Sequence, residues 1–321
     1  MIKKPTRDGY GNALLMLGES NPDVVVLDAD LAMSTRTNWF WEKYPDRFFD
    51  IGIAEQDMLG TAAGLAMGGK IPFATTYGVF IAGRAWDQIR TTICYANLNV
   101  KIVGAHGGIS VGPDGATHQA LEEIALMRVL PNMQMIVPCD AVETQKATLA
   151  AAAIPGPVYI RLTREPTPIF TSEEDEWHFG RANLLRSGSD VTIIGCGPIL
   201  YEALLAADQL AQQGVSCRVI NMHTIKPLDE AAILAAARET GAIVTVEEHQ
   251  VNAGLGGAIA EVLVKNYPVP VEMVGIKDTF GESGNPDDLA VKYGLTKKNI
   301  MAAALRALER KWVRRGDLYR D

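Results

Sequence analysis

The sequence has few of the residues that disulfide-bonded, metal-bound or membrane proteins need. Its 321 residues include four cysteines, Cys94, Cys139, Cys196 and Cys217, which lie far apart and form no CxxC pair. We therefore expect reduced thiols in or near the core. No uncharged apolar run reaches the roughly 18 residues of a membrane span, and no apolar segment follows the charged N-terminus as in a signal peptide. These absences predict a cytoplasmic protein without a membrane partner.

An excess of positive charge is also missing. The formal net charge is −8 and the sequence pI is about 5.3, which argues against nucleic acid as a partner. An anionic small molecule stays compatible, because a few local arginines can bind a phosphate whatever the net charge. The hydrophobic content of 48% is ordinary for a soluble globular protein. The length predicts about two domains of roughly 100–200 residues each.

Short apolar runs alternate with helical patterns in the first half of the chain. We expect strands at 24–28, 71–76, 100–105, 133–138 and 157–162, and helices at 54–67, 80–95, 116–128 and 141–153. Runs of Val and Ile bounded by Gly, Pro and Asp are typical of strands that are covered on both faces. Alternation of such strands with helices predicts a parallel sheet.

A connector rich in Pro, Ser and acidic residues, at 163–190, separates this series from a second one. The second series has expected strands at 191–195, 216–221, 242–248 and 269–275, and helices at 198–212, 229–238, 255–265 and 297–314. We therefore predict an α/β fold made of two parallel-sheet domains with helices on both faces. The domains are expected at residues 1–185 and 186–321.

Three segments of the first domain carry candidate functional residues. In FFDIGIAEQDMLGTAAGLAMGG, Glu55 follows a strand and lies in the first turn of a helix rich in Gly and Ala. That place is the carboxyl edge of a parallel sheet, where such folds bind ligands, although an acid there can also serve only the helix dipole. So many small residues lower helix propensity, which makes sense if another helix packs closely against this one.

The second segment contains an aromatic pair, Tyr77 and Phe80, at a strand-to-helix transition. The pair could be ordinary core or a stacking platform for a planar heterocycle. In the third, AHGGISVGPDGATHQALEE, a glycine-rich loop holds His106, Asp114 and His118. Polar residues on such a loop after a strand favour function. No HxH or HxxH pair is present, so we expect no metal site in this chain.

Together these segments resemble the transketolase family. The motifs are GxxExxM before a helix of small residues, the aromatic pair, H-x₇-D-G-x-T-H-Q, and PNMQMIVPCDAVET. The resemblance spans both expected domains, as the pyrimidine-binding domain of a thiamine-diphosphate enzyme followed by the transketolase C-terminal domain. It implies a transferase that moves a two-carbon ketol unit from a ketose phosphate to an aldose or aldose phosphate.

The resemblance also implies roles for individual residues. Glu55 matches the catalytic glutamate that hydrogen-bonds N1′ of the cofactor's aminopyrimidine, and a proton shared there promotes loss of the C2 proton from the thiazolium. Phe80 and Tyr77 match the aromatic residues at that ring, and Asp30 in LDADLAMS lies near the cofactor. His118 matches a catalytic histidine at the reacting oxygens, and Asp114 a ligand of a substrate hydroxyl.

A further set matches the family's phosphate-binding group. Its members are Arg7 in TRDGYGNAL, Ser34 in LAMS, His106 in GAHGG and Arg164 in RLTREP. Two guanidinium groups with hydroxyl and imidazole donors suit the terminal phosphate of a sugar. The sequence departs from the family pattern after His106: many members have an acid there, and this sequence has AHGGIS.

One expected part is missing. Full-length transketolases carry a diphosphate-binding domain with a GDG motif that holds Mg²⁺ or another divalent ion, and the sequence has no GDG. The resemblance therefore implies a partner, an N-terminal transketolase subunit that supplies the metal and diphosphate site. We expect a heterotetramer with two copies of each chain.

Other functions are compatible with parts of this pattern. The beta subunit of a 2-oxo-acid dehydrogenase decarboxylase shares the two-domain plan and a GIAEQ-like segment, but it needs no grip for a sugar phosphate. Deoxyxylulose phosphate synthase is normally one long chain. A non-catalytic partner subunit is the alternative from a different class, and the presence of Glu55 and Phe80 argues against it.

Overall fold

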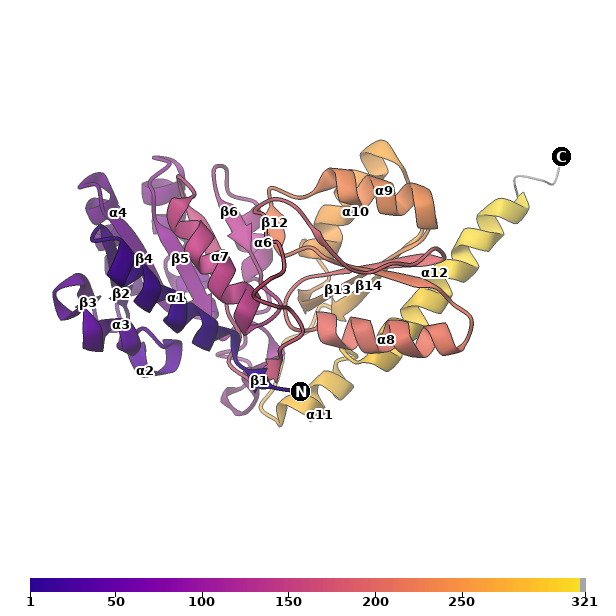
Figure 1. Cartoon of the computed structure of the whole chain (residues 1–321), viewed down its shortest axis with the longest axis horizontal. Coiled ribbons are helices and arrows are strands. Elements are labelled where there is room, and N and C mark those ends of the chain that lie inside the picture. Colours follow the sequence, from indigo (N-terminus) through magenta and orange to yellow (C-terminus); the bar gives the residue numbers. More distant parts are fainter. Residues whose placement is uncertain (318–321) are drawn as a thin grey trace.

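A seven-stranded sheet organises the first half of the molecule (Figure 1). The computed structural model describes residues 1–317, and side chains through residue 311. The sheet has the order β12-β6-β7-β5-β4-β2-β3, and every neighbouring pair is parallel except β12–β6. Its strands are β2 (Val24–Asp28), β3 (Phe48–Asp50), β4 (Ile71–Tyr77), β5 (Lys101–Ala105), β6 (Gln134–Ile136), β7 (Val158–Arg161) and β12 (Thr224–Lys226).

Helices cover both faces of this sheet, as predicted. Alternate residues of β2 enter different cores: Val24 and Val26 pack in one, Val25 and Leu27 in the other. This alternation is the period of two of a strand that is buried on both sides. Helices α1 (Thr6–Ser20) and α7 (Ala141–Ala153) supply the first core, and α4 (Glu55–Met67), α5 (Gly78–Arg84) and α6 (Glu123–Arg128) supply the second.

The second half builds a five-stranded sheet in the order β14-β13-β10-β11-β9, parallel except for β9. Its strands are β9 (Asn183–Arg186), β10 (Val191–Gly195), β11 (Cys217–Asn221), β13 (Ile243–Gln250) and β14 (Val271–Ile276). Its helices are α8 (Leu200–Gln212), α9 (Glu230–Thr240), α10 (Leu255–Asn266), α11 (Pro286–Lys292) and α12 (Lys297–Asp317). Residues of α8 and α12 pack in one core, and residues of α9 and α10 in another.

Short elements complete the chain. Strand β1 (Lys3–Lys4) pairs with β8 (Thr167–Pro168), and α2 (Ala32–Thr35) and α3 (Asn38–Lys43) follow β2. No helix among the described residues is long and apolar enough to cross a membrane. The α/β class with sheets that are mainly parallel is therefore confirmed, and the domain boundary near residue 185 stays a prediction.

Two local expectations were wrong. The helix expected at 116–128 begins only at Glu123, because Ala120 is drawn into a bridge with Gly107 and its carbonyl accepts the Gly108 N–H at 2.8 Å. The helix expected at 80–95 stops at Arg84, and a wider helical segment spans Gln88–Cys94. The edge strands β9 and β12 were not predicted. They run antiparallel, and β12 adds a strand from the second half to the first sheet.

A buried ion network joins the two halves. Arg161, at the end of β7, pairs with Glu123 and donates from Nη2 to the backbone carbonyl of Glu248 at 2.8 Å. Burial alone would lower the pKa of Arg161, but Glu123 and Glu248 beside it raise the pKa. The carboxylate of Glu248 accepts the Ser110 N–H at 2.6 Å, and burial raises its pKa even though Arg161 opposes the shift. The network thus ties strand β7, the glycine-rich loop and strand β13 together.

Arg161→Met should lower the free energy of unfolding by about 3–5 kcal/mol, because two buried carboxyl groups lose their cation. Chemical denaturation monitored by circular dichroism measures the change. The loss should be smaller at pH 5 than at pH 8, since burial raises the pKa of Glu248 and protonation can then neutralise this acid.

Arg186→Met is the matched control, because Arg186 pairs with Asp208 on the surface, where such a pair is worth about 0–1 kcal/mol. Equal losses in the two variants would show that the network adds nothing to stability.

Candidate functional site

The candidate residues of the first domain follow the carboxyl ends of adjacent parallel strands. Asp30 follows β2, Glu55 follows β3, Tyr77 ends β4, His106 follows β5 and Arg164 follows β7. These strands are neighbours in the order β7-β5-β4-β2-β3, so the residues meet at one edge of the sheet. This edge is where open α/β sheets bind ligands.

A buried aspartate shapes the loop 30–37 after β2. Asp28 accepts the Leu31 N–H at 2.6 Å and the hydroxyl groups of Thr35 and Thr37 at 2.9 and 2.7 Å. Burial raises the pKa of Asp28 to about 6, although the three hydrogen bonds oppose the shift. The polar sequence of the loop thus folds back onto its own strand.

Three arginines gather at this loop. Arg7 Nη1 donates to the Ser34 carbonyl at 2.6 Å, and its buried Nε has no hydrogen-bond partner among the described residues. Burial lowers the pKa of Arg7, and the nearby charges of Arg36 and Arg164 lower it further. Asp8 holds Arg36 through an ion pair of 2.8 Å. The result is a partly buried positive cluster suited to an anion.

His106 joins this cluster from β5. Its φ of 59° is a strained value for a non-glycine residue, and its ring stacks on Tyr77 with centroids 3.9 Å apart. Burial lowers the pKa of His106 to about 3, helped by the charges of Arg7 and Arg164. The imidazole is therefore neutral near pH 7, and its buried Nδ1 lacks a partner within the described chain.

The two residues after His106 must be glycine. A Cβ at Gly107 would lie 2.5 Å from Arg161 Nε, and one at Gly108 would overlap Glu248. Gly108 also has a φ of +92°, which favours glycine. The loop therefore rests directly on the buried ion network.

The same loop supplies Asp114 and His118. Arg164 Nη1 donates to the Val111 carbonyl at 2.8 Å and lies 3.4 Å from the Asp114 carboxylate. The ring of His118 meets that of Phe80 edge-on, with centroids 5.3 Å apart. Arg164 therefore belongs both to the positive cluster and to the scaffold of the loop.

Glu55 and Phe80 are linked by an arginine that sequence reasoning missed. Arg84 Nη1 lies 2.9 Å from Glu55 Oε1, and its guanidinium carbon lies 4.1 Å from the centre of the Phe80 ring. The rings of Phe80 and Tyr77 stack with centroids 5.6 Å apart. A carboxylate, two aromatic rings and an arginine therefore form one contact group.

The structure brings most of the predicted residues into two neighbouring groups, which are linked where the ring of Tyr77 stacks on that of His106. They are Glu55, Tyr77, Phe80 and His118 in one, and Arg7, Ser34, His106, Asp114 and Arg164 in the other. Asp30 lies in the same loop as Ser34, with an exposed side chain and a φ of 60°. The roles of all these residues stay predictions.

Arg36 and Arg84 were not predicted. Arg84 follows Phe80 by four residues, a spacing at which side chains meet on a helix, and this spacing could have indicated the contact between Arg84 and Phe80. Arg36 follows Ser34 by two residues, and its placement depends on Asp8 in another helix.

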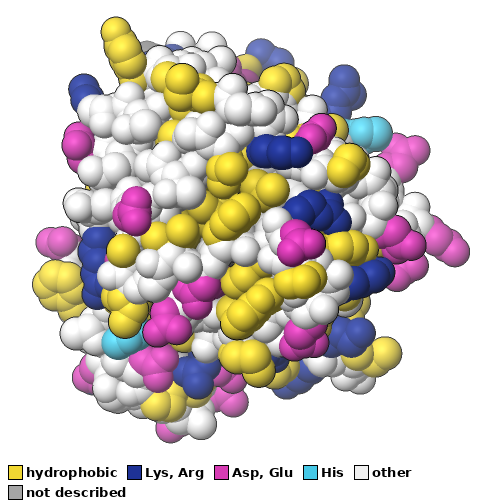
Figure 2. Space-filling view, turned by 90° about the vertical axis from the view of Figure 1, so that its left-hand side faces the viewer, with side chains coloured by type: hydrophobic (Ala, Val, Ile, Leu, Met, Phe, Trp, Pro, Cys, Tyr) yellow, Lys and Arg dark blue, Asp and Glu magenta, His cyan; other side chains and the backbone are white. Residues whose placement is uncertain are grey.

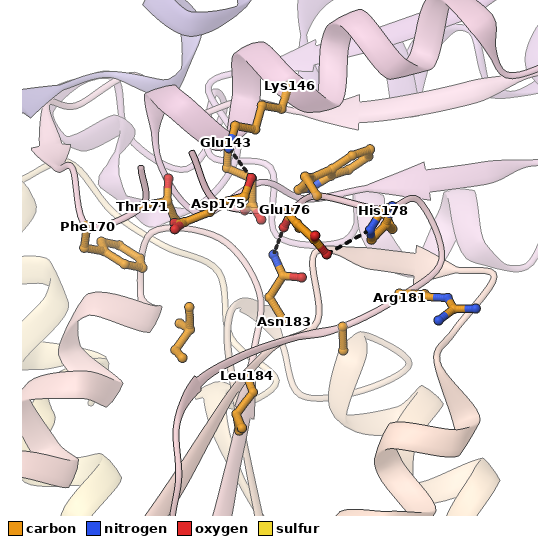
Figure 3. A pocket seen from close by; sticks show the side chains of 13 residues that line it. Glu143, Lys146, Phe170, Thr171, Asp175, Glu176, His178, Arg181, Asn183 and Leu184 are labelled. Atoms are coloured by element: carbon orange, nitrogen blue, oxygen red, sulfur yellow. Dashed lines mark hydrogen bonds and ion pairs between the residues drawn. The ribbon is translucent and has the colours of Figure 1, made fainter. Parts of the chain in front are cut away.

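A separate pocket lies between α7, the connector and β9 (Figure 3). Lys146 Nζ there donates to the carbonyls of Ser172 and Asp175 at 2.7 and 2.6 Å, and His178 lies 3.4 Å from Glu176. Most of its charged groups thus already have partners, and none of the predicted site residues lines it. We do not place the functional site in this pocket.

Comparison with family models identifies both halves of the chain. Residues 3–168 match the transketolase pyrimidine-binding domain, and residues 180–300 match the transketolase C-terminal domain. The chain belongs to the transketolase family. The resemblance drawn from the motifs is thereby confirmed over both domains.

Relatives of similar length support this assignment. This transketolase-family chain is 46% identical to the 6-deoxy-6-sulfo-D-fructose transketolase subunit SqwH of Clostridium sp. (strain MSTE9), and the match covers 95% of both chains. It is 45% identical to a putative transketolase C-terminal section of Methanocaldococcus jannaschii, over 93% of this chain and 95% of that one. It is 39% identical to one subunit of the apulose-4-phosphate transketolase of Phocaeicola vulgatus, over 93% and 96%.

A solved structure shares the fold closely. It is described as a split gene transketolase, inactive beta4 tetramer, and it is 51% identical to this chain with a TM-score of 0.90. The alignment covers 96% of this chain and 99% of that one. The two mainly parallel sheets are therefore those of a transketolase.

Proposed function

We propose that this chain is the pyrimidine-binding subunit of a two-chain, thiamine-diphosphate-dependent transketolase. It transfers a two-carbon ketol unit from a ketose to an aldose, and one of these sugars carries a phosphate or a similar anion. The observation that supports this proposal best is the shared sheet edge, where the Glu55–Phe80 group and the positive cluster meet through Tyr77 and His106.

The residues present fit the aminopyrimidine part of thiamine diphosphate. Glu55 is a nearly buried carboxylate, and its Oε2 has no hydrogen bond within the described residues. Phe80 and Tyr77 offer aromatic surface beside it. When bound, the cofactor supplies a C2–H group whose deprotonation gives a nucleophile that no side chain provides. Glu55 would hold a proton at N1′ of the ring, the position from which it promotes that deprotonation.

The positive cluster fits the anionic end of a sugar. Arg7, Arg164 and Arg36 provide the charge, and the neutral His106 provides an imidazole. The unpaired Nε of Arg7 and Nδ1 of His106 are buried polar atoms that a ligand could satisfy. Relatives act on a 6-deoxy-6-sulfo sugar and on apulose 4-phosphate, so sulfonate and phosphate are both to be tested.

Asp114 and His118 are proposed to face the reacting end of the same sugar. Asp114 lies 3.4 Å from Arg164, and His118 contacts the ring of Phe80. Asp114 thus borders the positive cluster, and His118 borders the aromatic rings proposed to hold the cofactor. Asp114 would bond a substrate hydroxyl, and His118 would exchange a proton with the reacting oxygens.

A second, partner chain is proposed to supply the diphosphate and its divalent ion, in an assembly of two copies of each chain. Relatives that this chain matches over nearly their whole length are called subunits or a C-terminal section. At the end of the molecule that carries α4, apolar side chains gather across the surface (Figure 2). The elements α2, α3 and β3, and α4 with the residues before it, carry the exposed large apolar residues Met33, Trp41, Phe49, Ile53 and Met67. Exposed apolar surface of this kind is typical of a protein interface.

The glycines of α4 belong to this surface. A Cβ at Gly60 or at Gly64 would meet nothing within 4 Å. The close packing predicted for this helix is therefore not made inside the chain, and we propose that the partner makes it. Small residues would let the two backbones approach closely.

The purified chain alone should show no ketol transfer with thiamine diphosphate and Mg²⁺, and adding the partner chain should restore it. Gly64→Leu should prevent this restoration by steric overlap at the interface, while its own fold persists because the space is open. Transfer assays and ultracentrifugation measure the two effects.

Gly257→Leu is the matched control, because this helical glycine of the second domain also has open space around it. Robust transfer by the chain alone, or unchanged association of Gly64→Leu, would contradict this proposal.

Arg164→Ala should raise KM for a phosphorylated acceptor roughly ten- to a hundredfold, because a charge-assisted hydrogen bond is worth about 1.5–3 kcal/mol. Its kcat should change much less, since a remote phosphate contact contributes mostly uniform binding. Steady-state kinetics with phosphorylated and unphosphorylated acceptors test this, with Arg181→Ala as an exposed control.

An unphosphorylated acceptor reports the second role of Arg164, its bonds to Val111 and Asp114. A small loss with this acceptor would measure the scaffold contribution. Equal losses with both acceptors would show that Arg164 is purely structural.

Glu55→Gln should lower kcat by roughly 10²–10⁴, the contribution of a positioned acid–base group. Cofactor affinity should fall modestly, because the aromatic surface and the diphosphate grip remain. Exchange of the C2 hydrogen for deuterium in the reconstituted complex measures the affected step directly.

Asp57→Asn is the control, because Asp57 is an exposed acid in the same first turn of α4. Exchange in Glu55→Gln as fast as in the wild type would return Glu55 to the role of a helix-start acid.

A further inference from the structure

Arg84 touches both residues that are expected to contact the cofactor ring. It is the last residue of α5, and its guanidinium pairs with Glu55 Oε1 at 2.9 Å while its central carbon lies 4.1 Å from the Phe80 ring centre. Gln56 Nε2 also donates to the Arg84 carbonyl at 3.0 Å. The end of α5 is thus joined to the start of α4 by two polar contacts.

The two partners differ in exposure. The Glu55 side chain is 5% exposed and that of Arg84 is 51% exposed. A polar group so deeply buried needs partners to offset its loss of water. Arg84 provides such a partner at one oxygen only, and Oε2 keeps no bond among the described residues.

The shape of the guanidinium matters as well as its charge. A planar guanidinium can lie against an aromatic ring and still donate in its own plane. Phe80 also touches the rings of Tyr77 and His118, so Arg84 completes a set of contacts that fixes its plane. Because the Arg84 side chain is half exposed, solvent screens its ion pair with Glu55, and the pair should contribute little to stability. The contact of Arg84 with both Glu55 and Phe80 therefore needs another explanation.

We propose that Arg84 is a positioning residue for the cofactor ring. It orients the Glu55 carboxylate through Oε1, leaves Oε2 for the ring nitrogen, and holds the plane of Phe80. This inference rests on the proposed thiamine-diphosphate function.

The proposal can be tested in the reconstituted complex with the variants Arg84→Met and Arg84→Lys. The control is Arg90→Met, because Arg90 is an exposed arginine of the next helical segment. Titration with thiamine diphosphate and Mg²⁺ gives Kd, and deuterium exchange at C2 gives the second readout. Arg84→Met should weaken binding and slow exchange roughly tenfold each, the effect of one charge-assisted hydrogen bond. Arg84→Lys should restore part of the exchange rate, because it keeps the charge but loses the planar contact.

A double-mutant cycle separates positioning from a general effect on stability. In a Glu55→Gln background, Arg84→Met should slow exchange much less than in the wild type, because the carboxylate on which it acts is gone. Fully additive losses would overturn the proposal.

Two other results would also overturn it. Unchanged Kd and exchange in Arg84→Met would leave the contact without a role, and tighter binding would mean that the guanidinium competes with the ring for Glu55 and Phe80. If the wild-type complex itself shows no C2 exchange that depends on this chain, the proposed function fails. If the wild-type complex exchanges and the Arg84 variant exchanges equally fast, only the proposal for Arg84 fails.

Discussion

The buried ion pair of Arg161 with Glu123, together with the hydrogen bond from Arg161 to the Glu248 carbonyl, is the constraint on which the rest of the site depends. It joins the end of β7, the start of α6 and strand β13 of the second half. Gly107 and Gly108 pack against it without room for a side chain. The position of the loop that carries Asp114 and His118 is therefore set by a charge network that is closed off from water, and it requires both halves of the chain.

The positive cluster stands on this scaffold at an energetic cost. Burial, and then the arginines at the same sheet edge, lower the pKa of Arg7, and His106 has a left-handed backbone conformation. Like charges and strained residues destabilise a fold, and they persist only where the surrounding structure imposes them. Their concentration at one edge, with buried atoms that lack partners among the described residues, is understandable if an anionic ligand completes the site.

Sequence patterns predicted the inner strands of both sheets well, because runs such as VVVLD at Val24–Asp28 satisfy two apolar cores at once. They failed where a distant contact overrode local preference. The segment before Glu123 has helical composition, but the bridge between Gly107 and Ala120 holds it as a loop. Arg84 was missed for a related reason: its meaning depends on Glu55, which lies in a different helix.

The sequence by itself determined the α/β class, the family and the types of residue at the sheet edge, since periodicity and motif order are local properties of the chain. Only the tertiary structure decided which residues meet. Helix α1 brings Arg7 to Ser34, α5 brings Arg84 to Glu55, and the second half brings Glu248 to the glycine-rich loop. These contacts arise from packing between distant segments, and the charge, pKa and orientation of each side chain depend on neighbours that no local pattern specifies.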